Sequence, residues 1–151
     1  MTTQELEFDR SQLGVEYDAG TFQVKADFII KICQTLGESN PMYIDEKAAQ
    51  AAGHPSLVAP PAFCGIFVRG FGRPDIGLKA GGGGMHAGEV IENLVPVYAG
   101  DVLTAKTALN DVYAKTGRTG TMIFVVWKTS FTNQRGEKVA DVQESFMRRA
   151  T

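Results

Sequence analysis

The sequence is poor in residues that bind metals or form disulfides, with two histidines and two cysteines among 151 residues. Both cysteines, Cys33 and Cys64, lie in apolar helical patterns. In such a pattern a small buried side chain is a commoner interpretation than a disulfide or a metal ligand. We therefore expect neither a disulfide framework nor a cysteine-based metal site.

Long apolar runs are also missing. No stretch of the sequence approaches the about 18 consecutive apolar residues that a membrane-spanning helix needs. The acidic N-terminus has no apolar core of signal-peptide length. We expect a cytoplasmic protein with no membrane partner.

An excess of one charge is absent as well, because 15 basic residues stand against 17 acidic ones and the longest basic block is Arg148–Arg149. Nucleic-acid binding normally needs a basic patch or stripe. The expected partner is therefore a small molecule or another protein. The chain fits one domain over residues 1–151, which can bury roughly two thirds of its unfolded surface.

The first half of the sequence combines one short strand with three helices. Side-chain alternation predicts the strand and apolar spacing predicts the helices, with Gly37 ending the first helix and Asp45 capping the second. The third helix is apolar on nearly every side, as a buried helix is. The expected elements are a mobile lead-in or helical turn over residues 1–13, a strand within Val15–Lys25, and helices over Ala26–Leu36, Glu46–Ala52 and Pro61–Arg69.

The second half begins with a glycine-rich segment, residues 70–84, and continues with strands. Its four consecutive glycines lack the helix start and the Lys-Ser/Thr of a phosphate-binding loop, so a flexible surface or lid loop is expected. Pro96 predicts an edge strand or a bulge, and Asp101 a turn. The expected strands are Met85–Tyr98, Val102–Ala114, Met122–Phe131 and Val139–Arg148. This order predicts an α+β fold, with a long antiparallel sheet around one buried helix.

The most specific motif lies in Leu36–Asp45, where a glycine, an acid, Asn-Pro, an aromatic residue and an aspartate occur at fixed spacing. This spacing resembles the signature of the MaoC-like dehydratases, the family that includes the (R)-specific enoyl-CoA hydratases. The similarity runs from about Phe22 onward, with further landmarks at Leu57–Phe63, Met85–Glu89 and Val95–Asp101. It is greatest to the N-terminal half of the double hot-dog members, or to a separately encoded equivalent of that half.

The resemblance implies a hot-dog fold with Pro61–Arg69 as its central helix. It also implies reversible addition of water to a trans-2-enoyl thioester, giving an (R)-3-hydroxyacyl thioester. The acyl group would be carried on coenzyme A or acyl carrier protein, and no metal or redox cofactor is required. A homodimer, or a heterodimer with another hot-dog subunit, is expected because an uncovered sheet edge needs a partner.

Two reacting positions depart from the family pattern, since Glu38 stands where the family usually has Asp and Tyr43 where it usually has His. The resemblance makes Glu38 the acid-base group, but an extra methylene displaces its carboxylate. A phenol is a poor base at neutral pH and a usable hydrogen-bond donor. Asn40 is expected to shape the turn, and its amide could position water or the thioester.

A third departure concerns the donor for the thioester oxygen. In active relatives this donor is a glycine N–H at the start of the central helix, where the sequence has Pro61, which has no N–H. Ala62 or Phe63 could donate instead from the helix N-terminus. Pro61, Ala62, Phe63 and His86 are the expected substrate-binding residues.

Simpler interpretations remain open for each candidate. Glu38 could be a solvated residue after a helix end, and Tyr43 could be part of the core. His54, before a proline, fits a loop residue better than a base. His86, in a strand beside Glu89, could donate to a carboxylate or line a subunit contact, and a structural histidine is favoured.

Three functions are consistent with the sequence. In the first, the chain is a hydratase/dehydratase subunit that binds the acyl chain and needs a second hot-dog chain for the full Asp/His site. In the second, it is a self-sufficient homodimeric hydratase that uses Glu38 and Tyr43. In the third, it is a non-catalytic protein that binds acyl thioesters.

Overall fold

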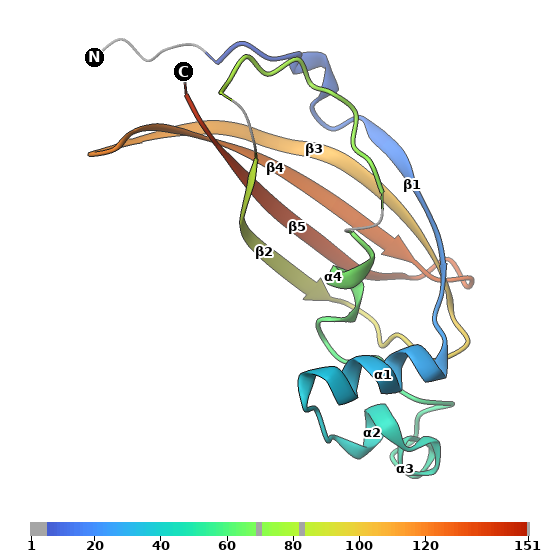
Figure 1. The fold of residues 1–151 in the computed structure, drawn as a ribbon. Helices are drawn as coiled ribbons and strands as arrows, with labels where there is room; N and C mark the ends of the chain where they lie inside the picture. Colours follow the sequence, from blue (N-terminus) through green and yellow to red (C-terminus); the bar gives the residue numbers. More distant parts are fainter. Residues whose placement is uncertain (1–5, 69–70, 82–83, 151) are drawn as a thin grey trace.

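The computed structural model describes residues 6–68, 71–81 and 84–150 (Figure 1). Within these ranges no helix has the length and apolar character needed to cross a membrane. The elements, in chain order, are η1 (Arg10–Gln12), β1 (Glu16–Gln23), α1 (Ala26–Leu36), α2 (Pro41–Ile44), α3 (Glu46–Ala51), α4 (Phe63–Phe67), β2 (Met85–Asn93), β3 (Val102–Gly117), β4 (Gly120–Thr132) and β5 (Lys138–Arg149).

The five strands form one antiparallel sheet in the order β1-β3-β4-β5-β2. The sheet is long and strongly curved, and α4 lies on its concave side, while α1, α2 and α3 gather at one end (Figure 1). We call the face toward α4 the inner face. The expected α+β sheet around a buried helix is confirmed.

The β3–β4 hairpin is longer than the sequence predicted. We expected strands over Val102–Ala114 and Met122–Phe131, but β3 continues to Gly117, which pairs with Gly120. Only two residues therefore connect the strands. Gly120 has a φ of 111°, a conformation that glycine adopts without a steric penalty.

The helix ends follow the local sequence closely. Gly37 ends α1 with a φ of 70°, and the N–H of Glu38 donates to the carbonyl of Cys33 at 2.9 Å. Asp45 caps α3 by accepting from the N–H groups of Lys47 and Ala48. Both predicted helix boundaries are therefore confirmed, and they fix the turn between α1 and α2.

The central helix α4 is shorter than expected, because it covers Phe63–Phe67 and not Pro61–Arg69. Its start is delayed by the turn at Pro60 and Pro61, which the N–H of Phe63 closes by donating to the carbonyl of Pro60 at 2.9 Å. Arg69, the expected last residue, lies outside the described ranges. Aromatic pairs hold α4 on the sheet, with ring centroids 4.6 Å apart for the stacked pair Phe22–Phe67 and 6.3 Å apart for Phe67–Phe131.

The described part of the glycine-rich segment, residues 71–81, forms no helix or strand, as expected of a loop. Residues 71–81 lie across the inner face, where Ile76 is buried against Leu109 and Trp127. The N–H of Asp9 donates to the carbonyl of Ile76 at 2.8 Å. One buried apolar side chain and one backbone hydrogen bond therefore connect the segment to the rest of the chain. Residues 70, 82 and 83 of the predicted lid lie outside the described ranges.

Candidate functional site

The motif turn between α1 and α2 uses its polar side chains to bind its own backbone. The carboxylate of Glu38 is exposed, and its Oε1 accepts from the N–H of Asn40 at 3.0 Å. The Oδ1 of Asn40 accepts from the N–H of Met42 at 3.1 Å and so caps α2. The expected turn-shaping role of Asn40 is confirmed. The bond from the N–H of Asn40 gives Glu38 a structural role in the turn.

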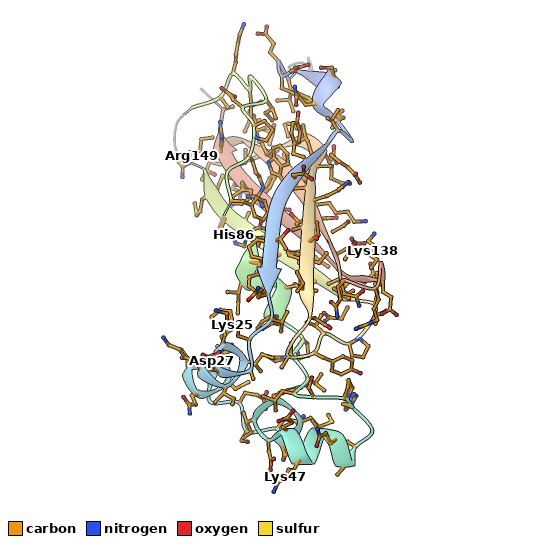
Figure 2. All side chains as sticks on the ribbon, turned by 90° about the vertical axis from the view of Figure 1, so that its right-hand side faces the viewer. Lys25, Asp27, Lys47, His86, Lys138 and Arg149 are labelled. Carbon is orange, nitrogen blue, oxygen red and sulfur yellow. The ribbon has the colours of Figure 1, made fainter. Side chains whose placement is uncertain are left out.

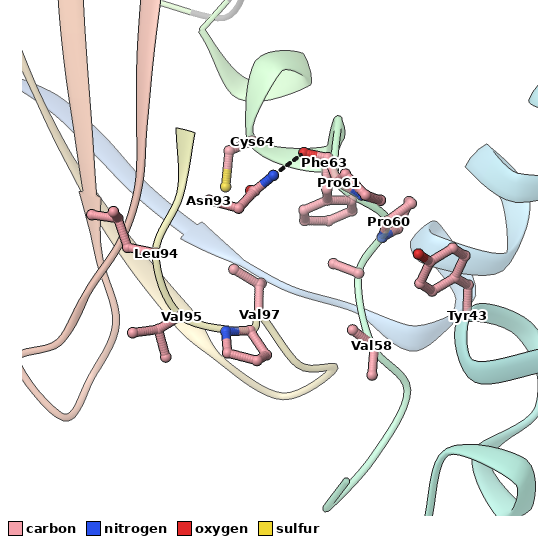
Figure 3. A pocket seen from close by; sticks show the side chains of 12 residues that line it. Tyr43, Val58, Pro60, Pro61, Phe63, Cys64, Asn93, Leu94, Val95 and Val97 are labelled. Atoms are coloured by element: carbon pink, nitrogen blue, oxygen red, sulfur yellow. Dashed lines mark hydrogen bonds between the residues drawn. The ribbon is translucent and has the colours of Figure 1, made fainter. Parts of the chain in front are cut away.

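A cavity of about 280 Å³ lies beside this turn. The ring of Tyr43 faces Pro60 at its wall, and a dashed line marks the bond from Asn93 Nδ2 to the carbonyl of Pro61, which is 3.0 Å long (Figure 3). The wall is mostly apolar, and its lining includes Val58, Phe63, Cys64, Leu94, Val95 and Val97. Tyr43 is half-buried and also packs on the core, so both interpretations of this residue fit its position.

Backbone bonds hold the proline segment at this cavity. The N–H of Val58 donates to the carbonyl of Met42 at 3.0 Å, and the N–H of Ala59 donates to the carbonyl of Val97 at 2.8 Å. The segment is therefore tied both to the motif turn and to the connection between β2 and β3. These bonds bring Tyr43 and Pro61, which are far apart in the sequence, to the same cavity.

An apolar groove of about 420 Å³ lies between α1 and α4, and we call it the α1–α4 groove. It shares Pro60 and Phe63 with the first cavity, so the two spaces adjoin. Ala62, one of the predicted substrate-binding residues, also lines it. Glu38 lines neither space. The full lining is Phe28, Lys31, Ile32, Thr35, Leu36, Pro60, Ala62, Phe63, Gly65, Ile66 and Glu89.

Gly65 lets β2 approach α4 at the floor of this groove. A Cβ built on Gly65 would lie 2.5 Å from Oε1 of Glu89 and 2.8 Å from Cδ1 of Ile91, which is closer than side chains tolerate. The carboxylate of Glu89 thus lies directly against the α4 backbone. It places one acid at the edge of an otherwise apolar groove.

The start of α4 offers fewer backbone N–H donors to a developing oxyanion than a helix N-terminus usually does. Pro61 has no N–H, and the N–H of Phe63 is already donated to the carbonyl of Pro60. Phe63 is also buried, with 1% of its surface exposed. Of the two donors that the sequence suggested, Ala62 is therefore the better placed, since it is exposed and lines the groove.

His86 belongs to a polar cluster on the inner face, away from the motif turn. Its Nε2 lies 3.4 Å from Oε2 of Glu144, and Arg73 pairs with the other carboxylate oxygen of Glu144. Figure 2 shows His86 beside the sheet, between Arg149 at one end and Lys25, Asp27 and Lys47 at the other. The structure thus brings His86 to a carboxylate, as the structural interpretation expected, although the carboxylate is that of Glu144.

The same cluster offers the ligand types that a divalent metal uses. One ligand atom each from His86, Glu89 and Glu144 lies within 4.8 Å of the others. Both oxygens of Glu144 already have partners, however, and its side chain is only 3% exposed. A metal here would have to displace Arg73, so ion pairing accounts for the geometry.

Both cysteines are buried, as the sequence predicted. Burial raises the pKa of the Cys64 thiol to about 12. Burial and then the negative charge of Glu38 raise the pKa of Cys33. Neither thiol has the lowered pKa and exposure of a nucleophile.

The loop residues His54 and Asp101 stabilise the segments behind the cavity. His54 Nδ1 lies 3.0 Å from the hydroxyl of Tyr98. Asp101 accepts from the N–H of Tyr98 at 3.0 Å and from Nε2 of Gln134 at 2.9 Å. Asp101 is a turn former, as predicted, and His54 lies in a loop.

Comparison with known proteins identifies the family. A family model described as FAS1-like, dehydratase domain region, matches residues 11–142. The chain belongs to this family. A UPF0336 protein of Parafrankia sp. (strain EAN1pec) is 32% identical to this chain over 138 residues, which is 86% of each chain.

Solved structures similar to this chain share its fold. One is a complex from Mycobacterium tuberculosis described as C-terminal truncated HadBC, a 3R-hydroxyacyl-ACP dehydratase. It matches with a TM-score of 0.72 and 23% identity, over 92% of this chain and 98% of that one. A protein described as a MaoC-like dehydratase matches with a TM-score of 0.81 and 19% identity, over 93% of this chain and 43% of that one. The predicted hot-dog fold and the resemblance to MaoC-like dehydratases are confirmed.

Sequence reasoning missed the groove and the polar cluster. Ile32 and Leu36 occupy apolar helical positions, a spacing typical of a buried helix face, but Leu36 is 67% exposed at the groove. Arg73 lies in the glycine-rich segment, where nothing in the sequence indicated a partner. The one usable signal was Glu89, an acid next to His86 in a strand.

Proposed function

We propose that this chain is a subunit of an (R)-specific enoyl-thioester hydratase, which in reverse is a 3-hydroxyacyl-thioester dehydratase. In this proposal it binds the acyl chain, and a second hot-dog chain supplies the full Asp/His pair. The single observation that carries it is the contrast between an apolar groove beside the motif turn and an acid in that turn which faces solvent and binds its own backbone.

The reaction needs a base for water, a proton donor for the α-carbon and a donor for the thioester oxygen. In the described structure Glu38 lines neither the cavity nor the α1–α4 groove. Tyr43 reaches the cavity, but a phenol suits donation better than proton abstraction at neutral pH. The residues of this chain therefore suit binding and orientation of the thioester better than activation of water.

The relatives support a role for a second chain. The HadBC structure is described as a complex, and the matched MaoC-like dehydratase is more than twice as long as this chain's match to it. Both arrangements would place a second hot-dog unit beside the one that corresponds to this chain. The substrate carrier, coenzyme A or acyl carrier protein, and the absence of a metal or redox cofactor belong to the same proposal.

A self-sufficient homodimeric hydratase that uses Glu38 and Tyr43 is the second candidate. The retained motif spacing and the position of Tyr43 at the cavity favour it. A non-catalytic protein that binds acyl thioesters is the third candidate, and the groove alone would be enough for it. These alternatives differ from the main proposal in turnover, not in acyl binding.

Acyl binding can be tested with a variant whose side chain fills the α1–α4 groove. Thr35 is exposed on α1 and lines the groove, whereas its neighbour Gln34 is exposed and does not line it. We expect Thr35→Trp to weaken binding of a fluorescent long-chain acyl-CoA by about tenfold or more, because the indole occupies the apolar space. Gln34→Trp is the matched control and should bind as the wild type does. Equal binding by both variants, or no binding by the wild type, would contradict the proposal.

A further inference from the structure

The polar side chains in the lining of the α1–α4 groove come from two walls. Lys31 and Thr35 belong to α1, whereas Glu89 belongs to β2. The hydroxyl of Thr35 already donates to the carbonyl of Lys31 at 2.9 Å. Glu89 is exposed, and within residues 6–68, 71–81 and 84–150 its carboxylate forms neither a salt bridge nor a side-chain hydrogen bond. The groove therefore contains a charged acceptor that a ligand can use.

The register of β2 turns Glu89 toward the groove and Glu92 away from it. Glu89 is opposite Glu144 of β5, which belongs to the polar cluster on the inner face. Glu92 is opposite Asp141 and, three residues further along the strand, lies on the other face. Glu92 is exposed and does not line the groove. The strand thus carries one acid in the groove and a comparable acid outside it.

Gly65 brings the carboxylate of Glu89 to the part of α4 that offers a backbone donor. Oε1 of Glu89 lies 2.5 Å from the position that a Cβ on Gly65 would occupy. The N–H of Gly65 donates to the carbonyl of Ala62 at 3.1 Å, so Gly65 lies one helical turn after Ala62. One turn advances about 5–6 Å along the helix axis. The carboxylate of Glu89 and the N–H of Ala62 therefore border the same short part of the groove.

A 3-hydroxyacyl thioester carries the two groups that match this pair. Its carbonyl oxygen accepts a hydrogen bond, and its hydroxyl, two carbons away, donates one. A saturated acyl chain has no donor at the third carbon. It would cover the carboxylate of Glu89 with methylene groups and give no hydrogen bond in exchange, which lowers affinity.

We propose that Glu89 is a substrate-binding residue that accepts a hydrogen bond from the 3-hydroxyl of the acyl chain. The groove then selects 3-hydroxyacyl thioesters over saturated ones. This role rests on the proposed function, since it concerns the groove that binds the acyl chain. In the same pose the N–H of Ala62 holds the thioester oxygen. Glu89 orients the hydroxyl, and the Asp/His pair of the second chain performs the proton transfers.

Competition against the fluorescent long-chain acyl-CoA tests this role with the chain alone. The competitors are saturated acyl-CoA, (R)-3-hydroxyacyl-CoA and acyl-CoA with a hydroxyl at the far end of the chain, all of equal chain length. We expect wild type to bind the 3-hydroxy compound about tenfold more tightly than the other two, because only its hydroxyl meets the carboxylate. Glu89→Leu should bind all three about equally.

The acid outside the groove provides the control. Glu92→Leu should keep the wild-type preference, because Glu92 does not line the groove. Glu89→Gln keeps an acceptor oxygen without the charge and should retain part of the preference. It also replaces Glu89→Leu if circular dichroism shows that the leucine variant does not fold. Equal binding of the three compounds by wild type, or a full preference in Glu89→Leu and Glu89→Gln, would overturn the role of Glu89.

These results separate the role of Glu89 from the proposed function. Equal binding of all three compounds by wild type would contradict the role of Glu89 and leave acyl binding intact. Failure of wild type to bind any acyl-CoA would contradict both. A preference that depends on Glu89, with no turnover when a second hot-dog chain is added, would support the role and contradict the hydratase function.

Discussion

The inner face of the sheet is covered in two different ways at its two ends. At the end where α1 and α4 lie, a cavity of about 280 Å³ and the α1–α4 groove of about 420 Å³ remain. At the other end, residues 71–81 fill the face with Ile76 and Arg73. We call these the open end and the sealed end. The two ends therefore differ in what lies against the inner face, which is open space at one end and side chains of residues 71–81 at the other.

The two ends also differ in how polar groups are used. At the sealed end, Glu144 is buried and paired with Arg73, whose guanidinium lies over the rings of Phe71, Trp127 and Phe146 at 5.1 to 5.8 Å. At the open end, the motif acid Glu38 is exposed and binds backbone. Between the ends, the hydroxyl of Thr129 donates to that of Thr107 at 3.1 Å, and both residues are buried.

The largest expected effect is the loss of folding stability in Arg73→Ala, a substitution at the sealed end. This change removes the cation that pairs with the buried carboxylate of Glu144, which then lies beside His86 and the acid Glu89, and it removes the cation from three aromatic rings. We expect the free energy of unfolding to fall by about 3 kcal/mol or more, as for other broken buried pairs. Urea unfolding followed by tryptophan fluorescence is the measurement, since Trp127 lies under Arg73.

The matched control is Lys79→Ala in the same segment. Lys79 pairs with Glu7, but both side chains are well exposed. The variant should therefore unfold close to wild type. If Arg73→Ala and Lys79→Ala behave alike, residues 71–81 do not seal the face and the contrast between the two ends fails.

A smaller effect is expected in the motif turn at the open end. Asn40→Ala removes the side-chain cap of α2 and should lower the free energy of unfolding by about 1 kcal/mol. Asn40→Asp keeps an acceptor oxygen and should retain most of this stability. A stability loss that is the same in both variants would contradict the capping role.

The smallest effect concerns the buried thiols. Because burial raises the pKa of Cys64 to about 12, roughly one thiol in ten thousand is ionised at pH 8. We expect native protein to react very slowly with a disulfide reagent at pH 8 and to react at both cysteines after unfolding in urea. If the native protein reacted fast and Cys64→Ala did not, the reagent would have reached Cys64 in the core from the open end. That result would contradict the burial of this thiol.

Much of the fold was predictable because local chemistry determines it. Gly37 ends α1 and Asp45 caps α3 through contacts within a few residues, and the β-strands follow alternation and turn residues. The short α4 and the sealed segment were not predictable. The length of α4 depends on a turn closed at Pro60. The position of residues 71–81 depends on contacts of Ile76 and Arg73 with strands that are far away in the sequence.

The candidate site was predictable only in part. The motif spacing led to the turn and to Tyr43 at the cavity, but it could not show that Glu38 faces solvent or that Phe63 donates its N–H to Pro60. Leu36 fits a core position by spacing, yet 67% of its surface is exposed. How far an apolar helix face is covered depends on tertiary packing, which no local pattern contains.

The most direct test of the central claim is turnover of trans-2-enoyl-CoA, followed by loss of enoyl absorbance, for the chain alone and for Glu38→Gln. The proposal predicts that the purified chain binds the thioester and does not hydrate it, and that Glu38→Gln binds equally well. Turnover by the chain alone that disappears in Glu38→Gln would contradict this account and make the chain a complete enzyme.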